Sequence, residues 1–211
     1  MGDEAWRTFL ARSEADPEVV GLILTGSRAR GSFARDDSDW DVRVVLRDDV
    51  DDATLGRWEL PHGSTIEGFA VRLADFATVG MPGTPSAWDR YSYVRATLVL
   101  DKLDGEIARL LAAKAIRPPE EARPAAELAL DGYINSYARS RKNARVGLRV
   151  AAHLDATESL PHLLDFLFAM HGRVRPFNRF LDGSSCRSRS PNPAGPSRRC
   201  SHESRRSPRT R

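Results

Sequence analysis

Two short polar stretches near the N-terminus have the residue types and spacing for phosphate and metal chemistry. Gly26-Ser27 follows an apolar run, and Asp39 and Asp41 come soon afterwards. Side chains alternate along a strand, so the two aspartates are expected to face the same way while Trp40 points into the opposite layer. Two carboxylates held side by side repel unless a cation lies between them, and hard oxygen ligands suit Mg²⁺. The pair predicts a divalent-cation site.

A Gly-Ser turn at the end of an apolar strand is suited to holding phosphate. Gly26 permits a sharp turn and a close approach to a ligand, and the Ser27 hydroxyl can join backbone N–H groups in an anion-binding nest. Arg28 and Arg30 add cationic donors nearby. The spacing from Gly26 to Gly31 mimics a Walker A loop, but Ser-Phe follows where Lys-Ser or Lys-Thr is required. Alone, such a turn is usually structural; ahead of the aspartate pair it predicts a phosphate site opposite a metal site.

The pattern of apolar residues around these stretches predicts a sheet domain. Short apolar and β-branched runs predict strands, and segments of helical character alternate with them. The expected strands are 19–24, 40–46, 65–73 and 94–100, and the expected helices are 6–14 and 105–115.

A second region of different character follows Arg117-Pro118-Pro119. Alanine and leucine recur at helical spacing over 121–150 and 160–171, which predicts two to four packed helices. The sequence thus predicts an α+β fold: a small mixed sheet flanked by helices over 1–116, then an all-helical domain over 123–182.

The last 29 residues differ in composition from the rest. Residues 183–211 contain eight arginines, one glutamate and no Leu, Ile, Val, Met or aromatic residue, so we expect disorder. Residues 175–181 look like the start of an ordered helix, and the abrupt change after them favours a frameshifted C-terminus. A native basic interaction arm is the alternative. The only cysteines, Cys186 and Cys200, lie here and predict neither a disulfide framework nor a zinc site.

The net charge of the chain has to be read in two parts. The whole chain carries +3, but the tail alone carries +7, which leaves −4 on the other 182 residues. A mildly acidic body does not favour nucleic-acid binding, which needs a basic face.

The polar stretches together carry a family resemblance. The Gly-Ser turn at 26–27, the glycine at 31 and the Ser-Asp-x-Asp sequence at 38–41 resemble the signature of the DNA polymerase β-type nucleotidyltransferase superfamily. More narrowly, a sheet domain followed by a helical domain resembles the bacterial aminoglycoside and other antibiotic nucleotidyltransferases. The wider architecture fits most of 1–182.

The resemblance implies roles for these residues. Gly26 and Ser27 would hold the nucleoside triphosphate, with Arg30 nearby, and Asp39 and Asp41 would hold two divalent ions, expected to be Mg²⁺.

The family also uses a third carboxylate on a neighbouring strand. Glu67 is the candidate, although aspartate is commoner there, and Asp101 is the second choice. The third acid can complete the metal site or take the proton of the attacking hydroxyl. Related enzymes place a helical lysine against the triphosphate, which points to Lys142 within the donor-rich segment 137–145. The plainer interpretations are an exposed strand acid for Glu67 and a solvated helix face for Lys142.

The resemblance implies transfer of a nucleoside monophosphate from an NTP, expected to be ATP, to an acceptor hydroxyl with release of pyrophosphate. A cationic aminoglycoside-like acceptor suits the acidic body. The Trp-Asp-Arg-Tyr segment at 88–91 either borders an acceptor site or serves domain packing. Two other classes stay open: a protein-modifying AMP transferase or antitoxin-like partner, and a catalytically silent nucleotide-binding module.

No apolar run approaches the ~18–20 residues that span a bilayer. Residues 1–12 mix apolar and charged side chains, unlike a signal peptide. We therefore predict a cytoplasmic protein that does not bind membranes, and the sequence leaves its oligomeric state open.

Overall fold

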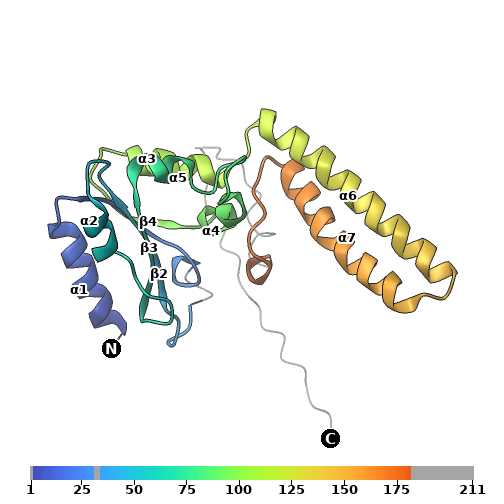
Figure 1. The fold of residues 1–211 in the computed structure, drawn as a ribbon, viewed down its shortest axis with the longest axis horizontal. Helices are drawn as coiled ribbons and strands as arrows, with labels where there is room; N and C mark the ends of the chain where they lie inside the picture. The colour runs from blue at the N-terminus through green and yellow to red at the C-terminus, as the bar shows by residue number, and fades with distance from the viewer. Residues whose placement is uncertain (1, 31–33, 182–211) are drawn as a thin grey trace, which may run out of the picture. The chain divides into compact units, whose positions relative to one another are not determined.

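A mixed four-stranded sheet with helices on both faces forms the first part of the chain, and two long helices form the second (Figure 1). The computed structural model describes residues 2–30 and 34–181. The predicted disordered tail, 183–211, and Gly31 lie outside the described residues. The elements are α1 (Gly2–Ala15), β1 (Val19–Leu24), η1 (Arg28–Arg30), β2 (Trp40–Leu46), α2 (Asp52–Arg57), β3 (Ile66–Arg72), α3 (Leu73–Thr78), η2 (Ala87–Asp89), α4 (Arg90–Tyr93), β4 (Thr97–Asp101), α5 (Glu106–Ala115), α6 (Pro119–Arg145), α7 (Arg149–Met170) and η3 (Asn178–Phe180).

The strand order β3-β2-β1-β4 determines which ends of the strands meet. β1 pairs antiparallel with β2 and β4, so the end of β1 lies beside the start of β2, with Leu24 opposite Val42. β2 pairs parallel with β3, and the first residues of the two strands are aligned, so that Asp41 lies opposite Glu67. Three polar segments that are distant in sequence therefore meet at one end of the sheet.

Apolar side chains on the two faces of the sheet build two cores. The alternation of strand side chains sends Leu22 and Val44 toward α1, and Ile23 and Val45 toward α3, α4 and α5. Each fully buried aliphatic side chain contributes about 1.5–3 kcal/mol. Helix-borne members of these cores are Phe9, Phe76, Tyr93, Ile107 and Leu111.

The α+β prediction is confirmed, and the strand predictions are close. The expected strands 19–24 and 40–46 coincide with β1 and β2. The strand expected over 94–100 starts later, at Thr97, because the chain is still leaving α4. The six-residue helices α2 and α3 were not predicted, since they are too short for a helical period to be read.

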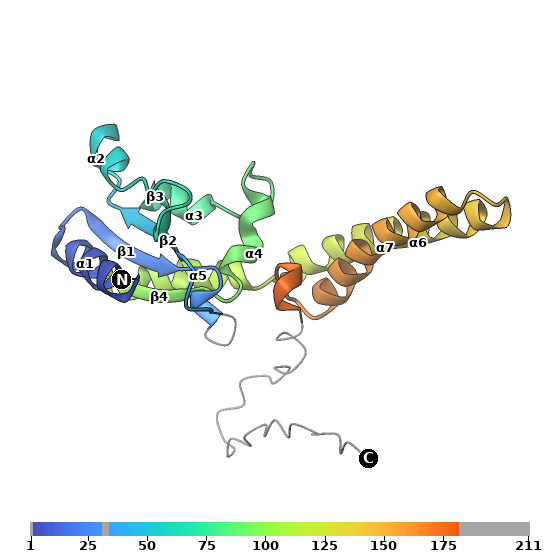
Figure 2. The same cartoon turned by 90° about the horizontal axis from the view of Figure 1, so that it is seen from below.

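The helical region consists of two helices, α6 and α7, that run antiparallel beside each other in both views (Figures 1 and 2). The helix expected over 121–150 is interrupted at Gly147, whose φ of 79° reverses the chain. Within 175–181, only the 3₁₀ turn η3 forms rather than the start of an α-helix.

Buried Arg90 joins α4 to the connection between α5 and α6. Its guanidinium donates to the carbonyls of Lys114 and Ile116 and pairs with Glu121 at 2.5 Å. The described residues up to Asn178 form one compact unit. The boundary between sheet and helical domains stays a prediction.

No helix in the described ranges combines the length and apolarity needed to cross a membrane.

Candidate active site

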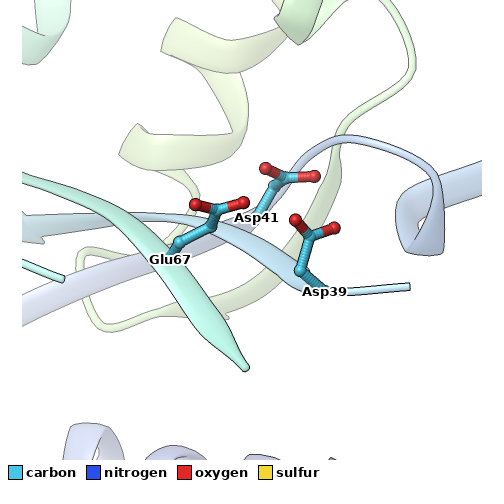
Figure 3. A group of neighbouring side chains, drawn as sticks. All are labelled: Asp39, Asp41 and Glu67. Carbon is cyan, nitrogen blue, oxygen red and sulfur yellow. The ribbon is translucent and has the colours of Figure 1, made fainter. Parts of the chain in front are cut away.

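Three carboxylates converge at the end of the sheet. Asp39 directly precedes β2, Asp41 lies within it, and Glu67 is opposite Asp41 on β3. One oxygen from each lies within 4.8 Å of the others, and the side chains point toward one another (Figure 3). The parallel register of β2 and β3 places Asp41 and Glu67 on the same face of the sheet.

The three acids influence one another's protonation. A hydrogen bond with Glu67, partial burial and the charge of Asp41 raise the pKa of Asp39 to about 6. Burial and the charge of Glu67 raise the pKa of Asp41. The hydrogen bond with Asp39 and one from the Gly63 N–H lower the pKa of Glu67. The cluster thus carries more negative charge than its surroundings favour, and its hard oxygen donors fit a divalent cation such as Mg²⁺.

Glu67 is held by a loop that sequence reasoning missed. The Gly63 N–H donates to Glu67 Oε2 at 2.9 Å, and His62 Nδ1 contacts the same oxygen. Gly68, with φ of 151°, allows β3 to lie tightly on β2, because a Cβ there would collide with the Val42 carbonyl. No sequence motif marks His62; only its position five residues before Glu67 could have pointed to it.

The packing of the acid cluster itself requires glycine at position 26. Its φ is +65°, and a Cβ at this position would overlap the Asp41 carboxylate. The turn is fixed to the same residue, since Thr25 N–H donates to the Asp41 carbonyl at 2.7 Å. Ser27, which follows, is buried. The expected reason for glycine was close approach to a ligand; the structure adds that Asp41 occupies the space a side chain would take.

Arg28 positions the aspartate loop. Its Nε donates to the Ser38 carbonyl at 2.8 Å, and its guanidinium lies 4.4 Å from the centre of the Trp40 ring. Trp40 in turn stacks on Trp6 of α1, on the opposite side of β2 from Asp41, as alternation predicted. The side chain of Arg30 lies outside the described part of the chain.

A pocket of about 470 Å³ adjoins the cluster. It has room for a polar ligand next to Asp39. Its lining comprises Arg28, Asp36, Asp37, Ser38, Asp39, Gly63, Ser64 and Thr65.

The structure separates the other candidates from the cluster. Asp101, the second choice for the third acid, pairs with Gly21 near the other end of β1 and accepts the N–H groups of Leu103 and Ala108. Glu67, not Asp101, lies beside the aspartates. Lys142 is exposed near the end of α6, and no hydrogen bond or ion pair between described residues links it to the cluster. Its role stays a prediction.

The 88–91 segment is partly buried and partly lines a pocket, and its role at an acceptor site stays a prediction. Asp89 and Arg90 are buried, and Asp89 pairs at 3.6 Å with Arg43, two residues after Asp41 on β2. Trp88 is 71% exposed, and Tyr91 stacks on Phe177 with ring centres 5.5 Å apart. All three aromatic rings line a second pocket of about 500 Å³.

The mixed sheet with acids converging beside a Gly-Ser turn defines a nucleotidyltransferase fold. The nucleotidyltransferase domain family matches residues 6–112, half of the chain, and the chain belongs to that family. This confirms the resemblance to the nucleotidyltransferase superfamily, while the narrower resemblance to antibiotic nucleotidyltransferases stays a prediction.

A solved structure of a nucleotidyltransferase-like protein from Exiguobacterium sibiricum 255-15 is similar, with 17% identity and a TM-score of 0.47. The match covers 86% of this chain but 61% of that protein, so the chain spans less than two thirds of its length. A search of curated proteins gave no match.

Proposed function

We propose that the protein is a Mg²⁺-dependent enzyme that transfers a nucleoside monophosphate from an NTP, with ATP the expected donor, to an acceptor hydroxyl. The observation that carries this proposal is the convergence of Asp39, Asp41 and Glu67 within 4.8 Å, directly against the Gly26 turn. Family membership supports nucleotidyl transfer as the reaction.

The reaction forms one bond and breaks another. The acceptor oxygen attacks the α-phosphorus, the bond from that phosphorus to the oxygen bridging toward the β-phosphorus breaks, and pyrophosphate leaves. Divalent ions bound at the cluster would activate the attacking oxygen and neutralise charge on the leaving group. Catalysis of this kind depends mainly on positioning and electrostatics.

The chain's own groups would position the reactants. Asp39, Asp41 and Glu67 would hold the ions, and the Gly26-Ser27 turn would bind the triphosphate. The acceptor proton would pass to a carboxylate of the cluster, and Glu67 is our candidate because Gly63 fixes its side chain.

The acceptor would occupy the pocket beside Tyr91. Asp89, two residues before Tyr91, pairs at 3.6 Å with Arg43 of β2, two residues after Asp41, which supports a location near the cluster. The lining contains three aromatic rings for a ring-shaped acceptor. Arg90 and Arg117 share one carboxylate, Glu121.

The charge of this lining bears on acceptor choice. Among the described residues that line the pocket, three are arginines and one, Asp165, is an acid. A neutral or anionic hydroxyl compound therefore fits better than the polycationic aminoglycoside that the acidic body first suggested.

The test is to incubate the protein with each α-labelled NTP, Mg²⁺ and an acceptor panel. The panel should contain aminoglycosides, neutral sugars, sugar phosphates and bacterial protein extract, with pyrophosphate release as the readout. Asp41→Asn and Glu67→Gln should lose activity by about 10²-fold or more, by analogy with removal of one preorganised group. Near-normal turnover by either variant would refute the assignment of the cluster.

A further inference from the structure

The hairpin of α6 and α7 exposes rows of large apolar side chains. On α6, Leu130, Ile134 and Tyr137 follow one another at intervals of four and three residues, which places them in one stripe. On α7, Leu160 and Leu167 are seven residues apart and also share a stripe. Ile134 is 54% exposed and Leu160 is 56% exposed. Large apolar side chains that are exposed side by side on one surface are typical of an interaction site.

The two stripes lie at matching levels of the hairpin. Arg139 of α6 pairs with Glu158 of α7 at 3.0 Å, and Gly132 lies against His162. Ile134 is therefore level with Leu160. We name the surface formed by Leu130, Ile134, Tyr137, Leu160 and Leu167 the hairpin face.

The residues that are buried between α6 and α7 do not cover the hairpin face. The buried positions of α6 and α7 are small, and within the described residues the helices pack chiefly on each other. These positions are Ala126, Ala129, Ser136, Ala152, Ser159 and Ala169. A pocket of about 520 Å³ between the helices, lined partly by Leu130, continues the face toward the start of α6.

Residues 183–211 have no large apolar side chains with which to cover the face. From 183 onward, the sequence has no Leu, Ile, Val, Met or aromatic residue and a net charge of +7. Burial of apolar area needs an apolar partner surface, and the same face of a second copy of this chain supplies one.

The distribution of charge along α6 indicates which partner would fit the hairpin face. Its first half is acidic and its last part, with the start of α7, is basic. Glu127 and Arg141 lie seven residues on either side of Ile134. The exposed acids of the first half are Glu120, Glu127 and Asp131, beside one exposed base, Arg123, and the exposed bases at the other end are Arg139, Arg141, Lys142, Arg145 and Arg149.

We propose that the hairpin face binds the same face of a second copy of this chain, with the two hairpins antiparallel in a four-helix bundle. In a two-fold symmetric pair centred near Ile134, the basic end of each α6 lies against the acidic half of the other. Arg141 of one subunit then faces Glu127 of the partner subunit. A parallel pair would instead bring like charges together.

The first experiment measures mass in solution by light scattering after gel filtration, at up to about 100 µM protein. The full chain should run at twice the monomer mass of 23.4 kDa. Ile134→Glu and Leu160→Glu should each lose the dimer. Leu128→Glu is the matched control, because Leu128 is 77% exposed on α6 but lies outside the stripe, and it should remain dimeric. A monomeric full chain, or dimeric stripe variants, would overturn the proposal.

The second experiment tests orientation and does not depend on how the glutamate variants fold. In a Cys186→Ser/Cys200→Ser background, Glu127→Cys and Arg141→Cys chains are mixed and oxidised. A disulfide-linked 127–141 pair should form in the mixture, and Arg141→Cys alone should give none. Cross-linking of Arg141→Cys with itself would show a parallel pair, and no cross-link in either sample would place any dimer contact elsewhere; both results contradict the proposal. Neither experiment reads nucleotidyl transfer, so failure here leaves the proposed function standing.

Discussion

Replacing Gly26 with alanine tests whether the Gly26-Ser27 turn and the acid cluster depend on each other. Gly26 has φ of +65°, and the Asp41 carboxylate occupies the place where a Cβ would be. A left-handed φ costs an alanine about 1–2 kcal/mol. The new methyl group also forces the Asp41 side chain to rotate away from Asp39 and Glu67.

The two effects have separate magnitudes. For a chain of this size, the strain corresponds to a drop in melting temperature of about 2–8 °C. Displacing Asp41 by as little as ~1 Å should reduce turnover by about 10²-fold, which is about 2.7 kcal/mol of transition-state stabilisation.

The matched control is Gly105→Ala. Gly105 also has a positive φ, +96°, but no atom lies within 4 Å of its Cβ position. Both variants should lose a similar amount of thermal stability. Only Gly26→Ala should lose pyrophosphate release and need more Mg²⁺ for half-maximal rate. Equal turnover in the two variants would show that Asp41 is not needed where the structure holds it.

Three further predictions concern other parts of the chain. His62→Ala should raise the Mg²⁺ concentration needed for half-maximal activity by about 10-fold. This is the lower end of the range for losing a group that orients a metal ligand, and we expect it because the His62 side chain is 97% exposed. An unchanged Mg²⁺ titration would show that His62 does not position Glu67. Burial, with a smaller effect of the Arg90 charge, lowers the pKa of Lys114 from 10.5 to about 8. Between pH 8 and pH 10.5 the unfolded chain therefore binds more protons at Lys114 than the folded chain does. The free energy of unfolding should rise with pH across this window by up to about 3 kcal/mol. Lys114→Met should remove that rise, as measured by urea unfolding at each pH. Deleting 183–211 should leave the melting temperature nearly unchanged, because the segment has no large apolar side chain to bury; a large drop would show that the tail packs.

Local sequence patterns determined much of the sheet domain. A continuous apolar run predicts β1, and alternation predicts that Asp41 and Trp40 face opposite ways, because the strand period depends only on backbone geometry. The turn at Gly26 and the aspartate pair could be assigned for the same reason: they adjoin strands that the chain forms locally.

The tertiary structure decided the rest of the site. The sequence put Glu67 ahead of Asp101 only through the family resemblance, because strand order and register cannot be read from one strand's pattern. The β2–β3 pairing is what places Glu67, and not Asp101, beside the aspartates. The support from His62 depends on a loop whose path no periodicity records. In the sequence, Arg28 was expected to donate hydrogen bonds to phosphate. In the structure its partners are the Ser38 carbonyl and the Trp40 ring, which come close to it only when β1 and β2 pair antiparallel. These contacts join residues far apart in the chain, and pairing and packing determine them rather than local preference.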